Sequence, residues 1–273
     1  MEPIPLRTSA NLAGAGVARW QQSRAVDRAH LHRVRRGVYA DGAAWAARPA
    51  RDRFAALARA TALNRRKPLI FSHVTAAVLL GLPLVGPLPS RVDVLMVGAS
   101  GGRSEPGLLA HRRAVAPDLA DADGLVVTSV AQTLVDVAAT SRLGRSLPML
   151  DEAIRREWVT AADLIALLED GPPIRAHARV RRAIEWADGR AANAGESLSR
   201  AVILEAGLAA PDLQREFQLP DGTNAFVDFY WEEVDLIGEF DGFLKYARAD
   251  GSGDADAAWK EKRREDGAGV PLA

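Results

Sequence analysis

Two runs of sequence specify the fold of the C-terminal part of the chain: Phe226-Val227-Asp228-Phe229-Tyr230, and then Leu236-Ile237-Gly238-Glu239-Phe240-Asp241-Gly242-Phe243-Leu244-Lys245. Each run is apolar with acids at alternating positions, and alternate residues of a strand point to one face. The pattern predicts two strands that bring Asp228 to the face of Glu239 and Asp241 if they pair as a hairpin. Clustered carboxylates repel one another unless a divalent cation bridges them. The pattern therefore indicates a Mg²⁺-dependent phosphodiesterase, with Lys245 offsetting charge on the phosphate.

A simpler alternative is that these acids alternate outward on a solvated sheet face. It stays open for Asp228 taken alone, although an acid inside an apolar run is costly to bury without a partner. Glu196 opens a helix expected before the sheet, where an acid also complements the helix dipole.

The composition describes a globular chain of 273 residues with no cysteine, which excludes disulfides and suits a reducing cytosol. No run of about 18 apolar residues is present, so we expect no membrane span and a cytoplasmic protein. The 35 basic and 35 acidic residues balance, but residues 1–66 hold thirteen arginines against four acids. Such a basic N-terminal segment predicts a polyanionic partner. Arginine-rich codon usage is the alternative explanation.

The first 42 residues have the element order of a winged helix-turn-helix. Residues 9–13 look like the end of a helix, Gly14-Ala15-Gly16 is a turn, 18–26 is a short helix and 31–40 is a hairpin. On the second helix and the hairpin we expect the DNA-binding residues to be Arg19, Gln22, Arg24, Arg33, Arg35 and Arg36. Trp20 is expected to pack in the core.

Residues 43–188 predict a mixed α/β and helical segment. Helices are expected at 49–66, 74–80, 130–139, 147–157, 161–169 and 175–187, and strands at 91–97, 108–111 and 125–127. The glycine-rich residues 98–102 are interpreted as a hairpin turn. We expect His73 to be a helix cap or a buried hydrogen-bonded group and His111 to lie at a solvated strand end. For Asp136, a pair with an arginine and an ordinary structural role both stay open.

Residues 189–273 predict a helix at 196–206, strands at 213–219, 225–230 and 234–240, and a charged helix at 256–266. One helix before a three-stranded meander gives an α+β order. The chain as a whole is therefore expected to be α+β.

The motifs Gly195-Glu196-Ser197, Asp228-Phe229 and Glu239-Phe240-Asp241-Gly242 with Lys245 resemble the PD-(D/E)XK nuclease superfamily. The similarity is to its very-short-patch-repair (Vsr-like) branch, over about residues 190–266. Asp241 stands where the superfamily has a lysine, and Lys245 where the branch has a histidine.

The resemblance implies metal-assisted hydrolysis of DNA by a nuclease domain at 189–273. Asp228 and Glu239 would hold Mg²⁺, Lys245 would stabilise transition-state charge, and Glu196 or Asp241 would orient the water or complete the metal shell. The tail Gly267–Ala273 is too short and glycine-rich for the branch's last strand, so we expect a truncated nuclease domain.

The stretch Val34-Arg35-Arg36-Gly37-Val38-Tyr39, with Ser72–Ala77 and Val127–Asp136, is similar to the type IV toxin-antitoxin family of AbiEi-like antitoxins. The resemblance implies a winged helix-turn-helix at 1–42, an antitoxin-like domain at 43–188, and transcriptional autoregulation. Three hypotheses follow: a Mg²⁺-dependent DNA endonuclease targeted by its basic module, a non-enzymatic regulator with a degenerate nuclease fold, and neutralisation of a cognate toxin.

Overall fold

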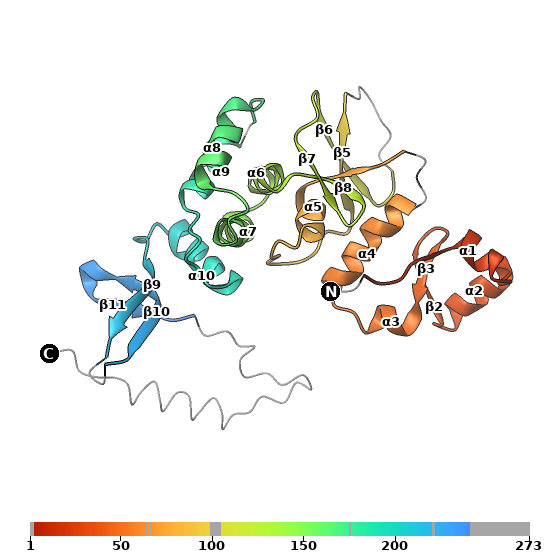
Figure 1. Ribbon diagram of the computed structural model, residues 1–273, viewed down its shortest axis with the longest axis horizontal. Helices are drawn as coiled ribbons and strands as arrows, with labels where there is room; N and C mark the ends of the chain where they lie inside the picture. The colour runs from red at the N-terminus through yellow and green to blue at the C-terminus, as the bar shows by residue number, and fades with distance from the viewer. Residues whose placement is uncertain are drawn as a thin grey trace. The chain divides into compact units, whose positions relative to one another are not determined.

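The computed structural model describes residues 3–63, 65, 67–98, 105–174, 176–219 and 222–240. The chain divides into two compact units, Met1–Ala209 and Ala210–Ala273, and each is considered by itself. Helices and strands are both present and alternate along the chain in mixed sheets (Figure 1), so the expected α+β class is confirmed. No helix in the described ranges is long and apolar enough to cross a membrane.

The N-terminal elements have the order expected for a winged helix-turn-helix. They are β1 (Arg7–Thr8), α1 (Ser9–Gly14), α2 (Arg19–Asp27), β2 (Leu31–Arg35), β3 (Val38–Asp41) and α3 (Gly42–Ala46), with sheet order β1-β3-β2. Residues 9–13 begin a helix and do not end one, because Thr8 and Asn11 form a capping box at its start. Gly16, with φ of +82°, makes the expected turn into α2.

The N-terminal elements from β1 to α3 (residues 7–46), called the winged module below, pack against helix α4 (Ala50–Leu63) through a small apolar cluster. Ile4, Ala40 and Ala56 are buried there, with Val34 and Trp45 packed against them. Because α4 also buries Phe54 and Ala58 in the two larger cores, one helix links the module to the rest of the first unit.

A five-stranded mixed sheet has the order β6-β5-β4-β8-β7. Its strands are β4 (Ile70–Phe71), β5 (Val92–Val97), β6 (Leu108–Arg113), β7 (Leu119–Ala122) and β8 (Leu125–Thr128). The interpretation of residues 98–102 as a hairpin turn is wrong, because β5 and β6 pair in parallel. Most of that glycine-rich stretch lies outside the described residues.

Helices α5 (His73–Leu79), α6 (Val130–Thr140), α7 (Leu143–Arg155), α8 (Ala161–Asp170) and α9 (His177–Glu185) form the main core. Figure 1 shows α6 to α9 gathered beside one another. Leu147, Leu164 and Ile184 are almost completely buried where these helices meet.

Helix α10 (Ala194–Glu205) belongs to the first unit, whereas the sequence had grouped it with the C-terminal segment from residue 189. It packs on α7, and the buried Arg200 donates from one Nη to both carboxylate oxygens of Asp151 at 2.7 Å. The compact boundary therefore follows α10 at Ala209.

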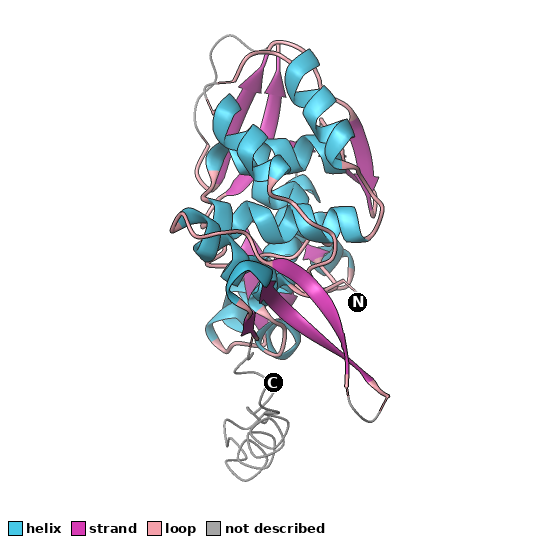
Figure 2. Cartoon of the chain, turned by 90° about the vertical axis from the view of Figure 1, so that its left-hand side faces the viewer, coloured by secondary structure: helices cyan, strands magenta, loops and turns pink. Residues whose placement is uncertain are grey.

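The second unit contains the expected three-stranded meander, in the order β11-β10-β9. Strands β9 (Asp212–Gln218) and β10 (Asn224–Trp231) are long and antiparallel and are drawn magenta in Figure 2. A 3₁₀ turn, η1 (Glu232–Val234), leads to β11 (Leu236–Gly238), which is shorter than expected. The predicted helix at 256–266 and the predicted missing last strand lie outside the described residues.

Candidate functional site

Helix α2 exposes nearly all of its surface. Of its nine residues only Gln22 is buried, while Arg19 and Arg24 are exposed. Trp20 is 64% exposed, which corrects the expectation that it packs in the core. A helix that buries so little apolar area gains little from packing, so this surface is available to a partner.

Gln22 braces the turn before the helix and does not extend toward solvent. It is 2% exposed, and its Nε2 donates to the carbonyl oxygen of Val17 at 3.0 Å and to that of Ser9 at 3.4 Å. The structure therefore removes Gln22 from the predicted DNA-reading residues, because a buried amide that holds the turn cannot reach a base edge.

The three predicted arginines of the wing lie in two different environments. Arg33 and Arg36 are exposed, one on β2 and one in the turn to β3. Arg35 is half-buried and donates from Nε to Thr61 Oγ1 at 2.9 Å and from Nη2 to the Gly107 carbonyl at 3.0 Å. The structure thus separates Arg35 from the predicted set of DNA contacts, because its guanidinium is bound to the protein itself.

A groove of about 1310 Å³ runs between α2, the wing and the C-terminal end of α4. Its walls carry Arg19, Arg33, Arg35, Arg36 and Arg65, together with Asp27 and Glu105. Burial lowers the pKa of the Arg35 guanidinium from its usual value, and the charge of Arg65 lowers it further, whereas Glu105 raises it. Glu105 already pairs with Arg65, and the remaining arginines outnumber Asp27, so the lining favours an anionic partner.

In the second unit, Asp228 lies at the middle of the sheet. Its Oδ1 accepts a hydrogen bond from Gln214 Nε2 of β9 at 3.1 Å, and its Oδ2 accepts one from the Phe240 backbone N–H at 2.8 Å. Val227 and Phe229, on either side of Asp228, are buried, while Asp228 is only partly buried. The expected alternation therefore turns Asp228 away from the apolar face.

Glu239 directly follows the last paired residue of β11. Phe229 pairs with Gly238 across β10 and β11, and this is the pair at which the ladder ends, so Asp228 and Glu239 are not paired across the two strands. The Phe240 N–H donates to Asp228 Oδ2 at 2.8 Å, which holds the segment after β11 beside Asp228. Glu239 is exposed, and its role as a metal ligand together with Asp228 stays a prediction.

The other predicted residues of the acidic site are not brought into this group. Asp241 and Lys245 lie outside the described residues. Within the described part of the chain, no three acids or histidines converge as a metal cluster. Asp228 and Glu239 are left as the two described members of the predicted acidic site, and Mg²⁺ accepts two carboxylates when water fills its other positions.

Glu196 lies in the first unit, near the start of α10. It is 3% exposed and accepts hydrogen bonds from the Ala192 backbone N–H at 2.8 Å and from the Asn193 amide. Asn193 in turn caps the helix by accepting from the Gly195 N–H at 2.8 Å. Glu196 thus stabilises its own helix N-terminus, and its predicted catalytic role stays a prediction.

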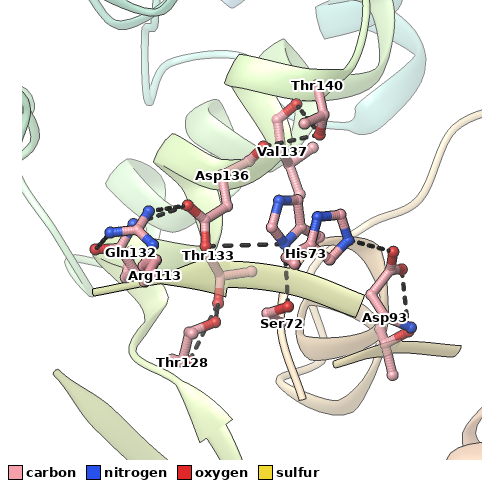
Figure 3. A network of polar contacts seen from close by, with 12 residues as sticks. Ser72, His73, Asp93, Arg113, Thr128, Gln132, Thr133, Asp136, Val137 and Thr140 are labelled. Atoms are coloured by element: carbon pink, nitrogen blue, oxygen red, sulfur yellow. Dashed lines mark hydrogen bonds and ion pairs between the residues drawn. The ribbon is translucent and has the colours of Figure 1, made fainter. Parts of the chain in front are cut away.

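A buried polar network joins the sheet to α5 and α6 (Figure 3). The sequence indicated only some of its members. His73 and His111 stack with ring centroids 3.4 Å apart. His111 Nε2 bonds Asp93 Oδ1 at 2.9 Å, so the expectation of a solvated strand end for His111 is wrong. The isolated Asp93 within the apolar strand 92–97 was the signal that could have revealed this pair.

His73 is the buried, hydrogen-bonded group that the sequence predicted, and Asp136 takes the arginine partner that the sequence had left open. Asp136 Oδ1 accepts from Arg113 Nη2 at 2.5 Å and from Gln132 Nε2 at 2.9 Å. His73 is buried and bonds Ser72 Oγ at 3.0 Å through Nδ1. Asp136 Oδ2, 3.9 Å from His73 Nδ1, has no hydrogen-bond partner within the described part of the chain.

Electrostatics keep His73 neutral in this network. Burial, together with the charges of His111 and Arg113, lowers the pKa of His73 to about 3. Burial raises the pKa of Asp136, although Arg113 and Gln132 oppose that shift. Ser72 is completely buried, so the Ser72–His73 pair offers no nucleophile to a substrate. The network holds the sheet against α5 and α6.

The comparisons with known proteins show no family. No family model matches the chain. Two proteins of Mycobacterium tuberculosis, the uncharacterized proteins MT2308 and Rv2248, are each 32% identical to it over 139 residues. These alignments cover 51% of this chain and 51% of each relative, so the chain spans about half the length of the curated relatives it matches.

Among solved structures, the crystal structure of the RV2827C protein from Mycobacterium tuberculosis resembles this chain with a TM-score of 0.42 at 18% identity. The alignment covers 80% of this chain and 85% of that one. A structural likeness at this level carries no argument about function.

Proposed function

We propose that the protein binds duplex DNA through α2 and the β2–β3 wing. The observation that carries this proposal is the exposure of α2, a nine-residue helix with a single buried residue that presents Arg19 and Arg24. Arginine is the residue best suited to pair with guanine edges in a major groove. The exposed Arg33 and Arg36 of the wing would contact the flanking phosphates.

The resemblance of residues 34–39, 72–77 and 127–136 to AbiEi-like antitoxins supports the same proposal, because that family's members are transcriptional autoregulators. A DNA partner would place the protein in the cytoplasm. Neutralisation of a cognate toxin is supported by this resemblance alone.

DNA binding is tested by fluorescence anisotropy with a labelled duplex that covers the DNA upstream of the protein's own coding sequence. The double variant Arg19→Ala/Arg24→Ala is expected to lose about 1–3 kcal/mol of binding free energy for each base contact removed. Arg156→Ala removes an exposed arginine from the end of α7 and is the matched control. Equal binding by the double variant and the control would exclude α2 as the DNA-reading helix.

We further propose that the second unit hydrolyses phosphodiester bonds with Mg²⁺. The supporting observation is that Glu239 directly follows β11, whose last residue, Gly238, pairs with Phe229 beside Asp228. These two carboxylates would hold the ion, which supplies polarisation of the phosphate and a lowered pKa for the attacking water. Following the nuclease resemblance, Lys245 would neutralise charge on the phosphate and Asp241 would orient the water, while Glu196 belongs to the first unit and is left out of this proposal.

Hydrolysis is tested by nicking of supercoiled plasmid with Mg²⁺ and with EDTA. Asp228→Asn and Glu239→Gln are expected to lower the rate at least a hundredfold, because each removes a charged ligand while keeping a hydrogen-bonding side chain of similar shape. Glu233→Gln, at an exposed acid of η1 in the same unit, is the matched control. Nicking that survives both ligand substitutions would refute the assignment.

A non-enzymatic regulator is the second candidate, and one contact favours it. Both carboxylate oxygens of Asp228 already accept hydrogen bonds, from Gln214 and from the Phe240 backbone N–H. A carboxylate paired in this way is stable without a metal ion. Specific binding to the upstream duplex with no Mg²⁺-dependent nicking would select this candidate.

A further inference from the structure

The wing contains a β-bulge that changes the direction of its arginines. Arg33 faces Tyr39 across the hairpin and Arg35 faces Val38, so Val34 has no partner of its own and the register shifts there. Without the bulge, Arg33 and Arg35 would point to the same face of β2. The extra residue bends the strand, and Arg33 is exposed while Arg35 is half-buried.

Arg35 uses all three guanidinium nitrogens to bind the neighbouring part of the first unit. Nε donates to Thr61 Oγ1 at 2.9 Å, Nη1 to the Pro106 carbonyl at 3.2 Å and Nη2 to the Gly107 carbonyl at 3.0 Å. Thr61 belongs to the last turn of α4, and Pro106 and Gly107 directly precede β6. The planar guanidinium fits this set of three acceptors, and the single ammonium of a lysine would not.

Gly107 suits its position because its φ of +79° strains any residue with a side chain. A Cβ built there would lie 2.6 Å from Arg35 Nη1, so a side chain at 107 would also displace the guanidinium. Thr61 is also held in place, because its hydroxyl donates to the Leu57 carbonyl at 2.6 Å. The acceptors of Arg35 are therefore fixed by the fold around them.

We infer that Arg35 is a positioning residue that fixes the wing against α4 and the start of β6, so that Arg33 and Arg36, and not Arg35, meet the phosphates of a bound duplex. The inference rests on the DNA-binding function proposed above. It makes the DNA-binding surface composite: the winged module presents the arginines, and Thr61, Pro106 and Gly107 set their position along one wall of the groove.

The test measures the affinity of the full chain for the labelled upstream duplex over a range of salt concentrations. Arg35→Lys keeps the charge and loses the three-point attachment, so binding should weaken about tenfold, the scale of one lost charged hydrogen bond. Thr61→Val removes one acceptor without changing any charge and should weaken binding in the same direction. Arg33→Ala should lower the slope of log K against log salt by about 0.9, as expected for one phosphate contact.

Arg35→Gln separates positioning from phosphate contact. If Arg35 only positions the wing, this variant weakens binding and leaves the salt slope as in the wild type. Titration at high protein concentration gives the active fraction of each variant, which separates a changed affinity from unfolded protein. Thr61→Val, an internal change of similar shape, keeps the test available if an Arg35 variant fails to fold.

Two results would overturn the inference. Wild-type affinity in Arg35→Lys would show that the three-point attachment does not affect binding, and a slope lowered by about 0.9 in Arg35→Gln would identify Arg35 as a phosphate contact. A wild-type protein that binds no duplex would instead reject the DNA-binding proposal, and the role of Arg35 with it. The two failures are distinguishable, because the wild type still binds DNA when only the inference about Arg35 is wrong.

Discussion

Replacing Arg200 by methionine should destabilise the first unit more than any surface substitution. Arg200 of α10 and Asp151 of α7 form an ion pair whose side chains are only 6% and 1% exposed. One guanidinium nitrogen of Arg200 contacts both carboxylate oxygens at 2.7 Å. Methionine is an unbranched side chain without charge, so the substitution removes the ionic partner of Asp151 together with the hydrogen bond from Arg200 Nη1 to the Trp186 carbonyl.

The magnitude follows from what remains around Asp151. After the substitution, the backbone N–H of Asp188, at 2.8 Å from Oδ1, still donates to the carboxylate, but no cation remains in the pair. Removing one partner of a buried pair costs about 3–5 kcal/mol because the other charge is left uncompensated. Domains are stable by about 5–15 kcal/mol, so the loss is a large part of the total.

Urea unfolding followed by circular dichroism measures this loss, with Arg156→Met as the matched control. Arg156 pairs with Glu152 but is 45% exposed, and an exposed pair contributes about 0–1 kcal/mol. The double variant Asp151→Leu/Arg200→Met removes both charges and should recover much of the stability lost in the single variant.

The pH dependence gives a second check on the same reasoning. Burial already raises the pKa of Asp151, against the opposing effect of Arg200, and loss of Arg200 raises it further. A folded-state pKa above the unfolded value means that the folded variant takes up a proton first as pH falls, so its deficit should shrink in acid. A deficit below about 1 kcal/mol at neutral pH would refute the assignment of a buried, mutually dependent pair.

Three further predictions concern other parts of the chain. His73 is neutral in the folded protein, with a pKa of about 3 against 6.5 for its ordinary value, so its contribution to stability is present above pH 6.5 and is lost as pH falls toward 3. His73→Asn, which tolerates the φ of +50° at this position, should lose less stability than the wild type over that range in urea titrations, and identical pH profiles would contradict the assignment. Thr160→Ala removes the capping box of α8 and should lower the unfolding free energy by about 1 kcal/mol in thermal melts, with no change speaking against the cap. Calorimetric titration should detect Mg²⁺ binding to the wild type and a loss of at least tenfold in affinity in Asp228→Asn, whereas equal heats in both would remove Asp228 from the metal site.

Local patterns predicted the elements that depend on neighbouring residues. The apolar alternation around Asp228 predicted β10, and the apolar pattern of residues 130–139 predicted α6, where Ser129 accepts from the Gln132 N–H. These features depend on backbone geometry within a few residues. The partner of Asp136, Arg113 on β6, is far away in the sequence and could not be named from it.

Features that depend on segments far apart in the chain could not be predicted from the sequence. The parallel pairing of β5 and β6, the burial of Gln22 and the exposure of Trp20 each depend on which surfaces meet after folding. Arg35 is the clearest case, because Arg33, Arg35 and Arg36 are equivalent as residue types. One bulge and the acceptors at Thr61 and Gly107 make Arg35 different.

The α+β order of elements and the basic character of the N-terminal module follow from the chain's local patterns, because strand and helix periodicities depend on neighbouring residues. Folding decides which arginines face solvent, that Glu196 accepts hydrogen bonds at its own helix start, and that a buried ion pair joins α10 to α7. Burial and long-range hydrogen bonds assign these roles, and both depend on residues far away in the sequence.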